Sequence, residues 1–330
     1  MDPAIYVGQL IIGIAILYWG AEWLIRGSAA VARTFGVKPL VVGLTVVAYG
    51  MSAPELAVST KTALEHAQPI ALGTVIGSCA ANISLILGLT ALISPPTIDS
   101  RIIRREVPVL IGSAIAVPIL LRNGVLSRLE GSLLVACAVV FTIATLTISA
   151  RLETDDVTDD GDARTRAEES GANMGGKGRP RSGRFASVMM TTLGIILLVV
   201  GSKFFVEGAR HIGAQAGMSE RMIGLTIVAL GTALPELMGS LLAASRGHSA
   251  LAVGSVVGSN LLNVFLVLGV TACLRPIRLG ERMHLVDLIG LVVLTLLGVI
   301  VLRGSRKISR LEGAILVAAY VAFIVCCAIF

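Results

Sequence analysis

Charge and aromatic residues are both scarce in this sequence. Asp, Glu, Lys and Arg make up only 15% of the 330 residues, whereas 55% are hydrophobic. Because a soluble domain usually carries about 25% charged residues, an ordinary soluble enzyme is excluded. A disordered chain is excluded too, since it needs low hydrophobicity and high net charge. Aromatic residues, at 4%, are too few for the girdles of an outer-membrane barrel. The composition indicates a helical protein that passes repeatedly through a lipid bilayer.

Signals for other kinds of site are also missing. The five cysteines lie in apolar runs without metal-ligand spacing, so they predict neither a disulfide framework nor a metal centre. The net charge of +6 comes without the basic patches and interleaved aromatic residues that mark nucleic-acid binding. No signal peptide with a basic start precedes the first apolar run. We expect no nucleic acid, no cofactor and no obligate protein partner.

Ten apolar runs approach the roughly 20 residues that a transmembrane helix needs. They are Ile5–Trp23, Pro39–Ala63, Pro69–Ile93, Val107–Leu121, Leu126–Ser149, Ala186–Val206, Met222–Ser245, Ala250–Leu274, Leu285–Leu302 and Leu311–Phe330. Between the fifth and sixth runs lies a polar, glycine-rich stretch, which we interpret as a flexible linker. The predicted domains are residues 1–149, the linker 150–185 and residues 186–330.

The two halves of the chain repeat each other. Residues 43–56 match 224–237 at nine of fourteen positions, and 73–92 match 254–273 at ten of twenty, both at an offset of 181. Because each half holds five spans, an odd number, the second half must enter the bilayer inverted. Inverted repeats are typical of secondary transporters, with the substrate site near the midplane. We predict an all-α polytopic membrane protein of about ten transmembrane helices, arranged as two inverted five-helix repeats.

The basic residues predict the orientation of these repeats. Lys and Arg number 18 in the loops on the side of the linker and 9 in the other loops. Since cytoplasmic loops collect Lys and Arg, the linker should be cytoplasmic and both termini outside. We expect a multi-pass protein of the cell membrane.

Each repeat carries a carboxylate in the middle of an apolar span, Glu55 in the second and Glu236 in the seventh. A charge at the bilayer centre is costly, so such a residue indicates function. Each follows a proline, Pro54 or Pro235, which removes a backbone donor and breaks or kinks the helix. Carbonyls freed just before the break need partners, and a bound cation can supply them. Oxygen ligands favour Ca²⁺ or Na⁺ over soft transition metals.

The next span of each repeat adds two polar side chains. Ser78 and Asn82 are four residues apart and share a helix face, as do Ser259 and Asn263. Four helices could therefore direct two Glu, two Asn and two Ser at one another, forming an oxygen-rich cage.

Other polar residues in the spans have simpler interpretations. A buried Ser can bond its own backbone four residues back, which we weigh for Ser84 and Ser240. A buried Asn can also join two helices by a hydrogen bond. Glu22 and Glu207 lie near span ends with an arginine close by, so we interpret them as interfacial charges.

The motifs GMSAPEL and GTALPEL, followed by GSCAAN and GSNLLN, resemble the two alpha-repeats of the sodium/calcium exchanger family within the cation/calcium antiporter superfamily. The resemblance covers nearly the whole chain. It implies that the second, third, seventh and eighth helices form an ion-binding core. It also implies that the first and sixth form a long tilted pair that slides across this core.

The resemblance implies a set of cation ligands by motif position. The set is Glu55, Glu236, Asn82, Asn263, Ser78, Ser259, Ser52, Thr232, Ala48, Ala229 and Met51. The glutamates would be the central carboxylates, and the four residues on the following helices would be polar ligands. Ser52 and Thr232 would offer hydroxyl or carbonyl oxygens, whereas Ala48 and Ala229 would offer main-chain carbonyls.

Two positions depart from the family pattern. Met51 stands where Thr is usual, which matters only if the Thr hydroxyl is a ligand. Ala233 stands where Ser is usual and removes a hydroxyl, which places one sodium site in question. Potassium-dependent relatives carry Asp at one of the positions of Asn82 and Asn263, so two asparagines argue against potassium coupling.

The predicted function is a secondary antiporter, not an enzyme, that moves Ca²⁺ out of the cell against inward Na⁺. Two carboxylates neutralise one Ca²⁺, or hold two or three Na⁺ with surplus charge. The first alternative is H⁺ as the coupling ion, with Glu55 and Glu236 protonated in the return step. A channel is a second alternative, which the inverted repeats disfavour. An intramembrane enzyme is a third, although no Ser/His pair, His cluster or Asp dyad is visible.

Overall fold

The computed structural model of the chain describes residues 3–35, 39–64, 68–98, 102–159, 181–215, 217, 229–279, 285–304 and 307–329. Within these residues, nine helical stretches are long and apolar enough to cross a membrane, and they coincide with nine of the ten predicted spans. The other predicted span is Met222–Ser245, whose first seven residues lie outside the described ones.

Helical segments follow a similar order in the two halves, with π-helical turns within several spans. The first half contains α1 (Pro3–Phe35), α2 (Pro39–Val42), η1 (Gly43–Val47, π), α3 (Ala48–Met51), α4 (Ala53–Leu64), α5 (Gln68–Ala80), η2 (Ala81–Ile86, π), α6 (Leu87–Ile93), η3 (Ile102–Glu106, π), α7 (Val107–Leu120), η4 (Leu121–Asn123, 3₁₀), β1 (Val125–Leu126) and α8 (Arg128–Asp159). The second half contains α10 (Arg181–Gln215), α12 (Ala229–Thr232), α13 (Leu234–Ser245), α14 (Ser249–Leu262), η6 (Asn263–Leu268, π), α15 (Gly269–Leu274), β2 (Ile277–Arg278), α16 (Leu285–Gly304) and α17 (Arg310–Ile329).

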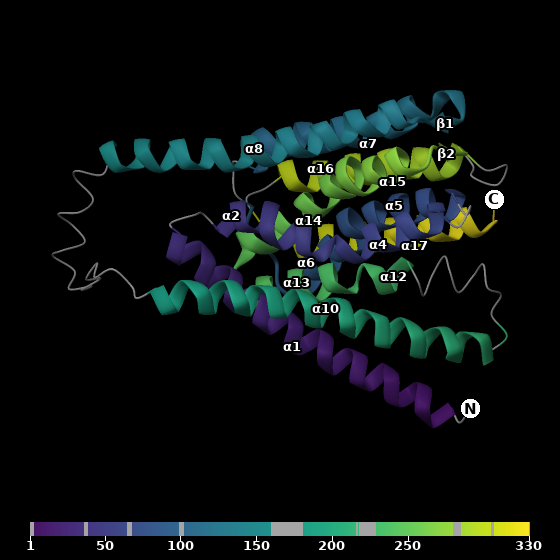
Figure 1. Ribbon diagram of the computed structural model, residues 1–330, viewed down its shortest axis with the longest axis horizontal. Helices are drawn as coiled ribbons and strands as arrows, with labels where there is room; N and C mark the ends of the chain where they lie inside the picture. Colours follow the sequence, from purple (N-terminus) through teal and green to yellow (C-terminus); the bar gives the residue numbers. More distant parts are fainter. Residues whose placement is uncertain are drawn as a thin grey trace.

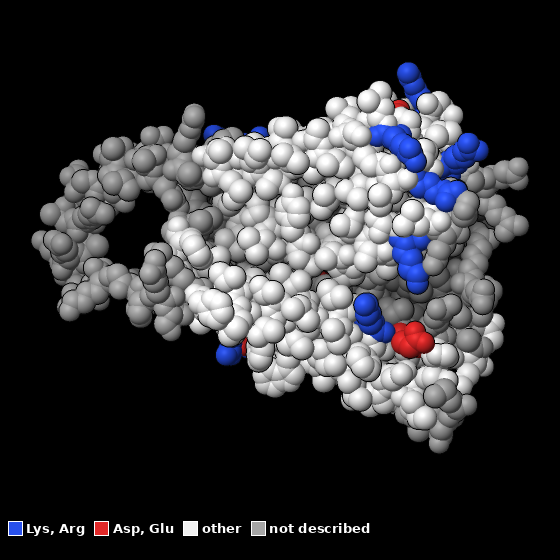
Figure 2. All heavy atoms as spheres, viewed as in Figure 1, with Lys and Arg blue, Asp and Glu red and all other residues white. Residues whose placement is uncertain are grey.

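The distribution of polar and apolar side chains is the reverse of that in a soluble protein. Large apolar residues are exposed on the outer helices, as Leu129 (81%) and Ile300 (66%) show, while Glu55 and Glu236 are 0% exposed. Figure 2 shows uncharged surface over the middle of the molecule and Lys and Arg gathered toward the end that carries β1 and β2. Lipid is the solvent that such a surface requires.

The two longest pieces of the bundle, α1 and α10, lie side by side along one edge (Figure 1). Their backbones touch: a Cβ added to Gly13 would lie 2.7 Å from the nitrogen of Phe205, and one added to Gly20 would lie 2.8 Å from that of Leu198. Partner numbers fall along α10 as they rise along α1, so the helices are antiparallel, as an inverted repeat demands. Small residues at such contacts let helix backbones approach closely.

Several helices extend past the predicted spans. α1 continues from the predicted end at Trp23 to Phe35, giving 33 residues, and α10 has 35. These lengths agree with the long first and sixth helices that the resemblance implied. α8 also continues to Asp159, and α10 already begins at Arg181, so helix enters the predicted linker from both ends. The end of α8 and the start of α10 lie at the same end of the molecule, called here the linker side (Figure 1).

The two halves interlock around α5 and α14. α17 packs against α6 of the first half, and α8 packs against α15 of the second. Both crossings use glycines: a Cβ on Gly88 would lie 2.8 Å from the carbonyl of Gly313, and one on Gly131 would lie 2.8 Å from that of Gly269. The span built from α14, η6 and α15 is consequently 94% buried, against 22% for α17. The candidate site therefore lies on the most enclosed helices.

Short extended segments tie the loops of one half to those of the other. β1 and β2 pair antiparallel, with Val125 opposite Arg278. An isolated antiparallel bridge joins Thr97, after α6, to Lys307, between α16 and α17. Each bridge pairs a first-half loop with a second-half loop, which repeats the pseudo-symmetry seen in the helices.

The close packing of α1 on α10 predicts that a large side chain at Gly20 is not tolerated. Gly20→Leu should lower the melting temperature of the detergent-solubilised protein, because overpacking against the backbone of Leu198 costs about 1–3 kcal/mol. Gly8→Leu is the matched control on the same helix, since a Cβ there meets nothing within 4 Å. Equal melting temperatures for the two variants would contradict backbone contact between α1 and α10.

Candidate cation-binding site

Two spans are interrupted just before the predicted prolines. Ser52 separates α3 from α4 with φ −78° and ψ 0°, and Ala233 separates α12 from α13 with φ −86° and ψ 0°. Pro54 and Pro235 follow two residues later and bring no N–H group to the helical ladder. Each break therefore starts a new helix inside the protein, at the depth where the candidate carboxylates lie.

Glu55 and Glu236 occupy the first turns of α4 and α13. Both side chains are 0% exposed, and their helices pack against segments of the opposite half, α4 against η6 and α13 against η2. The N-terminal end of a helix carries a partial positive charge, which favours a carboxylate there. Among the described residues, no lysine, arginine or histidine forms an ion pair with either carboxylate. The fold thus buries two acidic groups that no described cationic side chain neutralises.

The predicted polar ligands of the following spans lie on segments that pack against the helices of the carboxylates. Ser78 lies on α5 and Asn82 on η2, while Ser259 lies on α14 and Asn263 begins η6; all four are 0% exposed. η6 packs against α4, the helix of Glu55, and η2 packs against α13, so the polar groups of one half meet the helix of the other. Within the described part of the chain, the amides of both asparagines and the Ser78 hydroxyl have no hydrogen-bond partner.

Both asparagines lie in π-helical turns. η2 starts one residue before Asn82, and η6 starts at Asn263. The N–H of Leu87 bonds the carbonyl of Asn82, five residues back, which is the π-helical spacing. Such widened turns are often found at functional sites. They were not predicted, since nothing in the residue pattern distinguishes them from ordinary α-helix.

The remaining predicted ligands lie at the two breaks. Ser52 is buried, and its hydroxyl has no partner among the described residues. Its N–H donates to the carbonyl of Ala48 at 2.9 Å, so that carbonyl keeps one lone pair for another partner. Thr232 is buried at the end of α12. Ala229, the first residue of α12, is described by its backbone alone.

Met51 has a different environment from the other predicted ligands. Its side chain is buried in an apolar cluster with Leu17 and Leu24 of α1, against Gly239 of α13. The thioether therefore packs at the interface between α1 and the core. Methionine has no side-chain oxygen, so the main-chain carbonyl of Met51 remains its candidate ligand.

A second pair of hydroxyls lies one helical turn from Glu236 and Ser259, toward the linker side. Sequence reasoning did not select this pair. Ser240 follows Glu236 by four residues, Ser255 precedes Ser259 by four, and their Oγ atoms are 3.2 Å apart. Ser240 therefore bonds a serine of the neighbouring helix and not its own backbone, which was one of the interpretations that we weighed. Ser84 likewise donates to the carbonyl of Leu316 on α17 at 2.6 Å. The four-residue spacing from the ligands was the available signal for Ser240 and Ser255.

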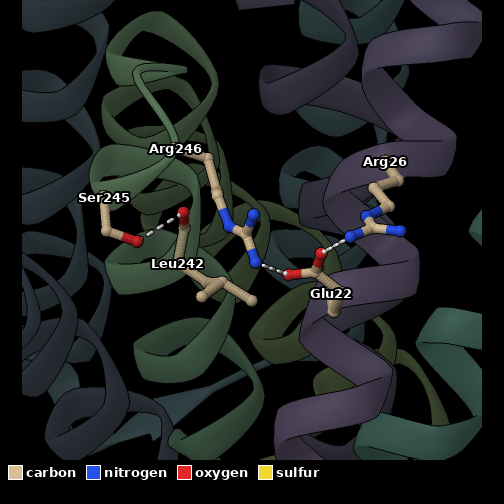
Figure 3. A network of polar contacts seen from close by, with 5 residues as sticks. All are labelled: Glu22, Arg26, Leu242, Ser245 and Arg246. Atoms are coloured by element: carbon tan, nitrogen blue, oxygen red, sulfur yellow. Dashed lines mark hydrogen bonds and ion pairs between the residues drawn. The ribbon is translucent and has the colours of Figure 1, made fainter.

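The two carboxylates expected at the interface differ. Glu207 is exposed on α10 and pairs with His211 at 3.1 Å. Glu22 is buried, with 4% exposure, although the side chains of the two arginines that it contacts are 63% and 46% exposed. It accepts hydrogen bonds from Arg26 and Arg246, as Figure 3 shows. Intramolecular pairing accounts for its burial, because a buried charge is stable when it is paired.

The sequence repeat and its paired motifs belong to a known family. The family described as sodium/calcium exchanger protein matches residues 5–147 and 186–328, which are the two halves of the structure. This chain belongs to the sodium/calcium exchanger family. It is thus a multi-pass membrane antiporter of the sodium/calcium exchanger type and not an enzyme, and the prediction of two inverted five-helix repeats is confirmed.

Similar proteins align over nearly full length. The chain is 33% identical to the putative antiporter CaxA of Alkalimonas amylolytica, covering 95% of this chain and 96% of that one. It is 31% identical to the sodium/calcium exchanger MaX1 of Methanosarcina acetivorans, with 96% of each chain covered. A solved structure of the sodium-calcium exchanger NCX_Mj superposes with a TM-score of 0.81 at 30% identity, covering 98% of this chain and 99% of that one.

The unpaired carboxylates predict an unusual effect on stability. At a pH high enough to ionise both, and in a buffer without divalent cations or Na⁺, Glu236→Gln should raise the melting temperature, because it removes a buried charge that costs several kcal/mol. Added Ca²⁺ should then stabilise the parent more than the variant, since the parent gains a ligand for both carboxylates. Glu312→Gln is the control, because Glu312 caps α17 through Ser309 and Gln can replace it there. A lower melting temperature for Glu236→Gln would contradict this electrostatic account.

Proposed function

We propose that this antiporter exchanges Ca²⁺ for Na⁺, binding both ions in the cage formed by Glu55, Glu236, Ser78, Asn82, Ser259 and Asn263, with oxygens of Ser52, Thr232, Ala48, Ala229 and Met51 completing the set. The observation that carries the proposal is the pair of fully buried carboxylates, which have no ion-pair partner in the described part of the chain. Support for the ions comes from NCX_Mj, a sodium-calcium exchanger with structures soaked with Na⁺, Ca²⁺ or Sr²⁺. Residues 150–185 would connect the two repeats.

Charge determines what the cage can hold. Two carboxylates balance one Ca²⁺, and hard oxygen ligands suit both Ca²⁺ and Na⁺. Two or three Na⁺ also fit this charge, the third adding a surplus that makes transport sensitive to voltage. The empty cage would carry two buried negative charges, which disfavours its passage between the two sides. Exchange without leak then follows from alternating access of one site, and inward Na⁺ drives Ca²⁺ out.

Proton coupling is the second candidate, and one observation favours it. Ala233 is buried at the break before α13, where Ser52 supplies a hydroxyl at the matching position of the first repeat. The second break thus offers one neutral oxygen fewer to a Na⁺ ion. Protonation of Glu55 and Glu236 would then neutralise the cage and let the site without Ca²⁺ return to the other side of the membrane. Burial supports this step, since it favours the neutral form of a carboxyl group.

Ca²⁺ uptake into proteoliposomes distinguishes the two coupling ions. Vesicles loaded with Na⁺ should accumulate Ca²⁺ when diluted into Na⁺-free buffer, whereas a pH gradient at matched voltage should not drive uptake. Glu236→Gln vesicles provide the background, because that variant lacks one of the two charges of the cage. Uptake that follows the pH gradient and ignores Na⁺ would replace sodium coupling with proton coupling.

Restoring the missing hydroxyl should strengthen Na⁺ binding. Ala233→Ser should lower the Na⁺ concentration for half-maximal exchange and leave the apparent affinity for Ca²⁺ nearly unchanged, because the carboxylates dominate Ca²⁺ binding. Ser84→Ala is the matched control. It removes a hydroxyl where Ala233→Ser adds one, and Ser84 joins η2 to α17 away from the breaks. An unchanged Na⁺ dependence in Ala233→Ser would show that this position supplies no sodium ligand.

We also propose that the protein lies in the cell membrane with the linker in the cytoplasm and both termini outside, on the strength of the positive-inside rule. In intact cells, a cysteine introduced at Gly171 should resist a membrane-impermeant thiol reagent, and one at Asp2 should react. The parent protein, with its five native cysteines, sets the baseline. The reverse labelling pattern would invert the orientation and leave the inverted repeats intact.

A further inference from the structure

Glu22 is bonded to two arginines from different helices. Its Oε1 lies 2.5 Å from Nη2 of Arg26, one turn further along α1, and its Oε2 lies 2.8 Å from Nη2 of Arg246. The carboxylate side chain is 5% exposed, whereas those of the arginines are 63% and 46% exposed. Figure 3 shows the carboxylate between the two guanidinium groups, one for each oxygen.

This network connects the long helix pair to the ion-binding core. Arg246 directly follows α13, the helix that carries Glu236 in its first turn. α1 belongs to the glycine-packed pair with α10 and also packs against α13. Beneath the network, Leu24 of α1 and Met51 of the core share one apolar cluster. The network therefore closes the α1–α13 contact at its linker-side end.

The two ion pairs respond differently to separation of the helices. Arg26 is on the same helix as Glu22, so their bond survives any rigid movement of α1. Arg246 is on the core, so its bond to Glu22 must break when α1 leaves α13. Because Arg26 stays paired with the carboxylate, Glu22 is never left as an isolated charge, and separation avoids the full penalty of an unpaired buried ion. This arrangement makes the contact reversible.

The other repeat carries the same set of charges with every sign reversed. At the offset of 181 residues, Glu22 corresponds to Lys203, Arg26 to Glu207 and Arg246 to Glu65. Lys203 and Glu207 are both exposed on α10, in contrast to the buried Glu22. A set of three charges thus occurs in both repeats, with opposite signs. Among the described residues of these two sets, the buried carboxylate is Glu22, on the linker side.

We propose that Glu22 is a positioning residue that, through Arg246, holds α1 against α13 and so keeps the linker side of the cage closed. The inference rests on the proposed alternating-access exchange. Breaking the bond between Glu22 and Arg246 permits the pair of α1 and α10 to move as one body and opens the cage to the linker side, while Arg26 neutralises the released carboxylate.

The test measures opening directly, without transport. Ser255→Cys, placed in a chain whose native cysteines are replaced by alanine, reports access to the linker side of the cage, because Ser255 is 2% exposed one turn from Ser259. Inside-out vesicles are treated with a small, charged, membrane-impermeant thiol reagent. Glu22→Gln should raise the modification rate about tenfold, which corresponds to about 1.4 kcal/mol in the closed–open equilibrium. Arg246→Gln should raise it similarly.

Reversal of all three charges separates positioning from simple destabilisation. The triple variant Glu22→Lys, Arg26→Glu, Arg246→Glu reproduces the charge set of the other repeat and should restore the slow rate. Glu207→Gln is the matched control, since Glu207 also pairs with a residue four positions along its helix but is exposed; it should leave the rate unchanged.

Two results would overturn the proposal: a parental rate in both Glu22→Gln and Arg246→Gln, or a fast rate that persists in the triple variant. Arg246 is half exposed, so Arg246→Gln keeps the test informative if Glu22→Gln does not fold. Failure here leaves ion coupling untouched, because modification needs no gradient. Failure of the proposed exchange would instead appear as loss of Na⁺-driven Ca²⁺ uptake with normal modification rates.

Discussion

Two carboxylates lie in the middle of an apolar bundle, and no group in the described chain neutralises them. Such a pair is unstable without cations, because desolvation and mutual repulsion act together. The local structure reduces this cost in specific ways. Prolines start α4 and α13 at this depth, so each glutamate lies at the positive end of a helix, and π-helical turns at Asn82 and Asn263 carry amide oxygens to the same region. The protein lowers the cost of the charges without pairing them, which leaves them available to an ion.

Much of this architecture could be predicted from the residues. Hydropathy gives the spans, and the constant offset gives the repeat, because both depend on patterns that extend over many residues. The predicted first span, which ends at Trp23, was too short. The charges of Glu22 and Arg26 were interpreted as the end of the apolar run. In the structure these two charges pair with each other, so the helix continues to Phe35.

The parts that could not be predicted depend on contacts between distant segments. Nothing near Glu22 in the sequence indicates that Arg246 lies beside it. The four-residue spacing of Ser240 and Ser255 from the predicted ligands indicates a shared region, but not the bond between them. η2 and η6 pack against the opposite half of the protein, and nothing in the residue pattern around Asn82 or Asn263 indicates their π-helical turns. The positions of the ligand residues could be predicted from the repeated motifs, whereas the contacts that hold their helices in place required the structure.

The close packing of α1 on α10 restricts the movements that could open the cage. Backbone contact at Gly13 and Gly20 leaves no space for one helix to move along the other without the glycines parting, so the pair should move as one body. In the proposed exchange, a rigid movement that separates the pair from the core at one end would bring it closer at the other, because the helices are antiparallel and related by the inverted repeat. Under the proposed mechanism, the bond of Glu22 to Arg246 at one end would therefore influence access at both ends. Exchange without leak needs this reciprocity, since a site open to both sides would conduct ions freely.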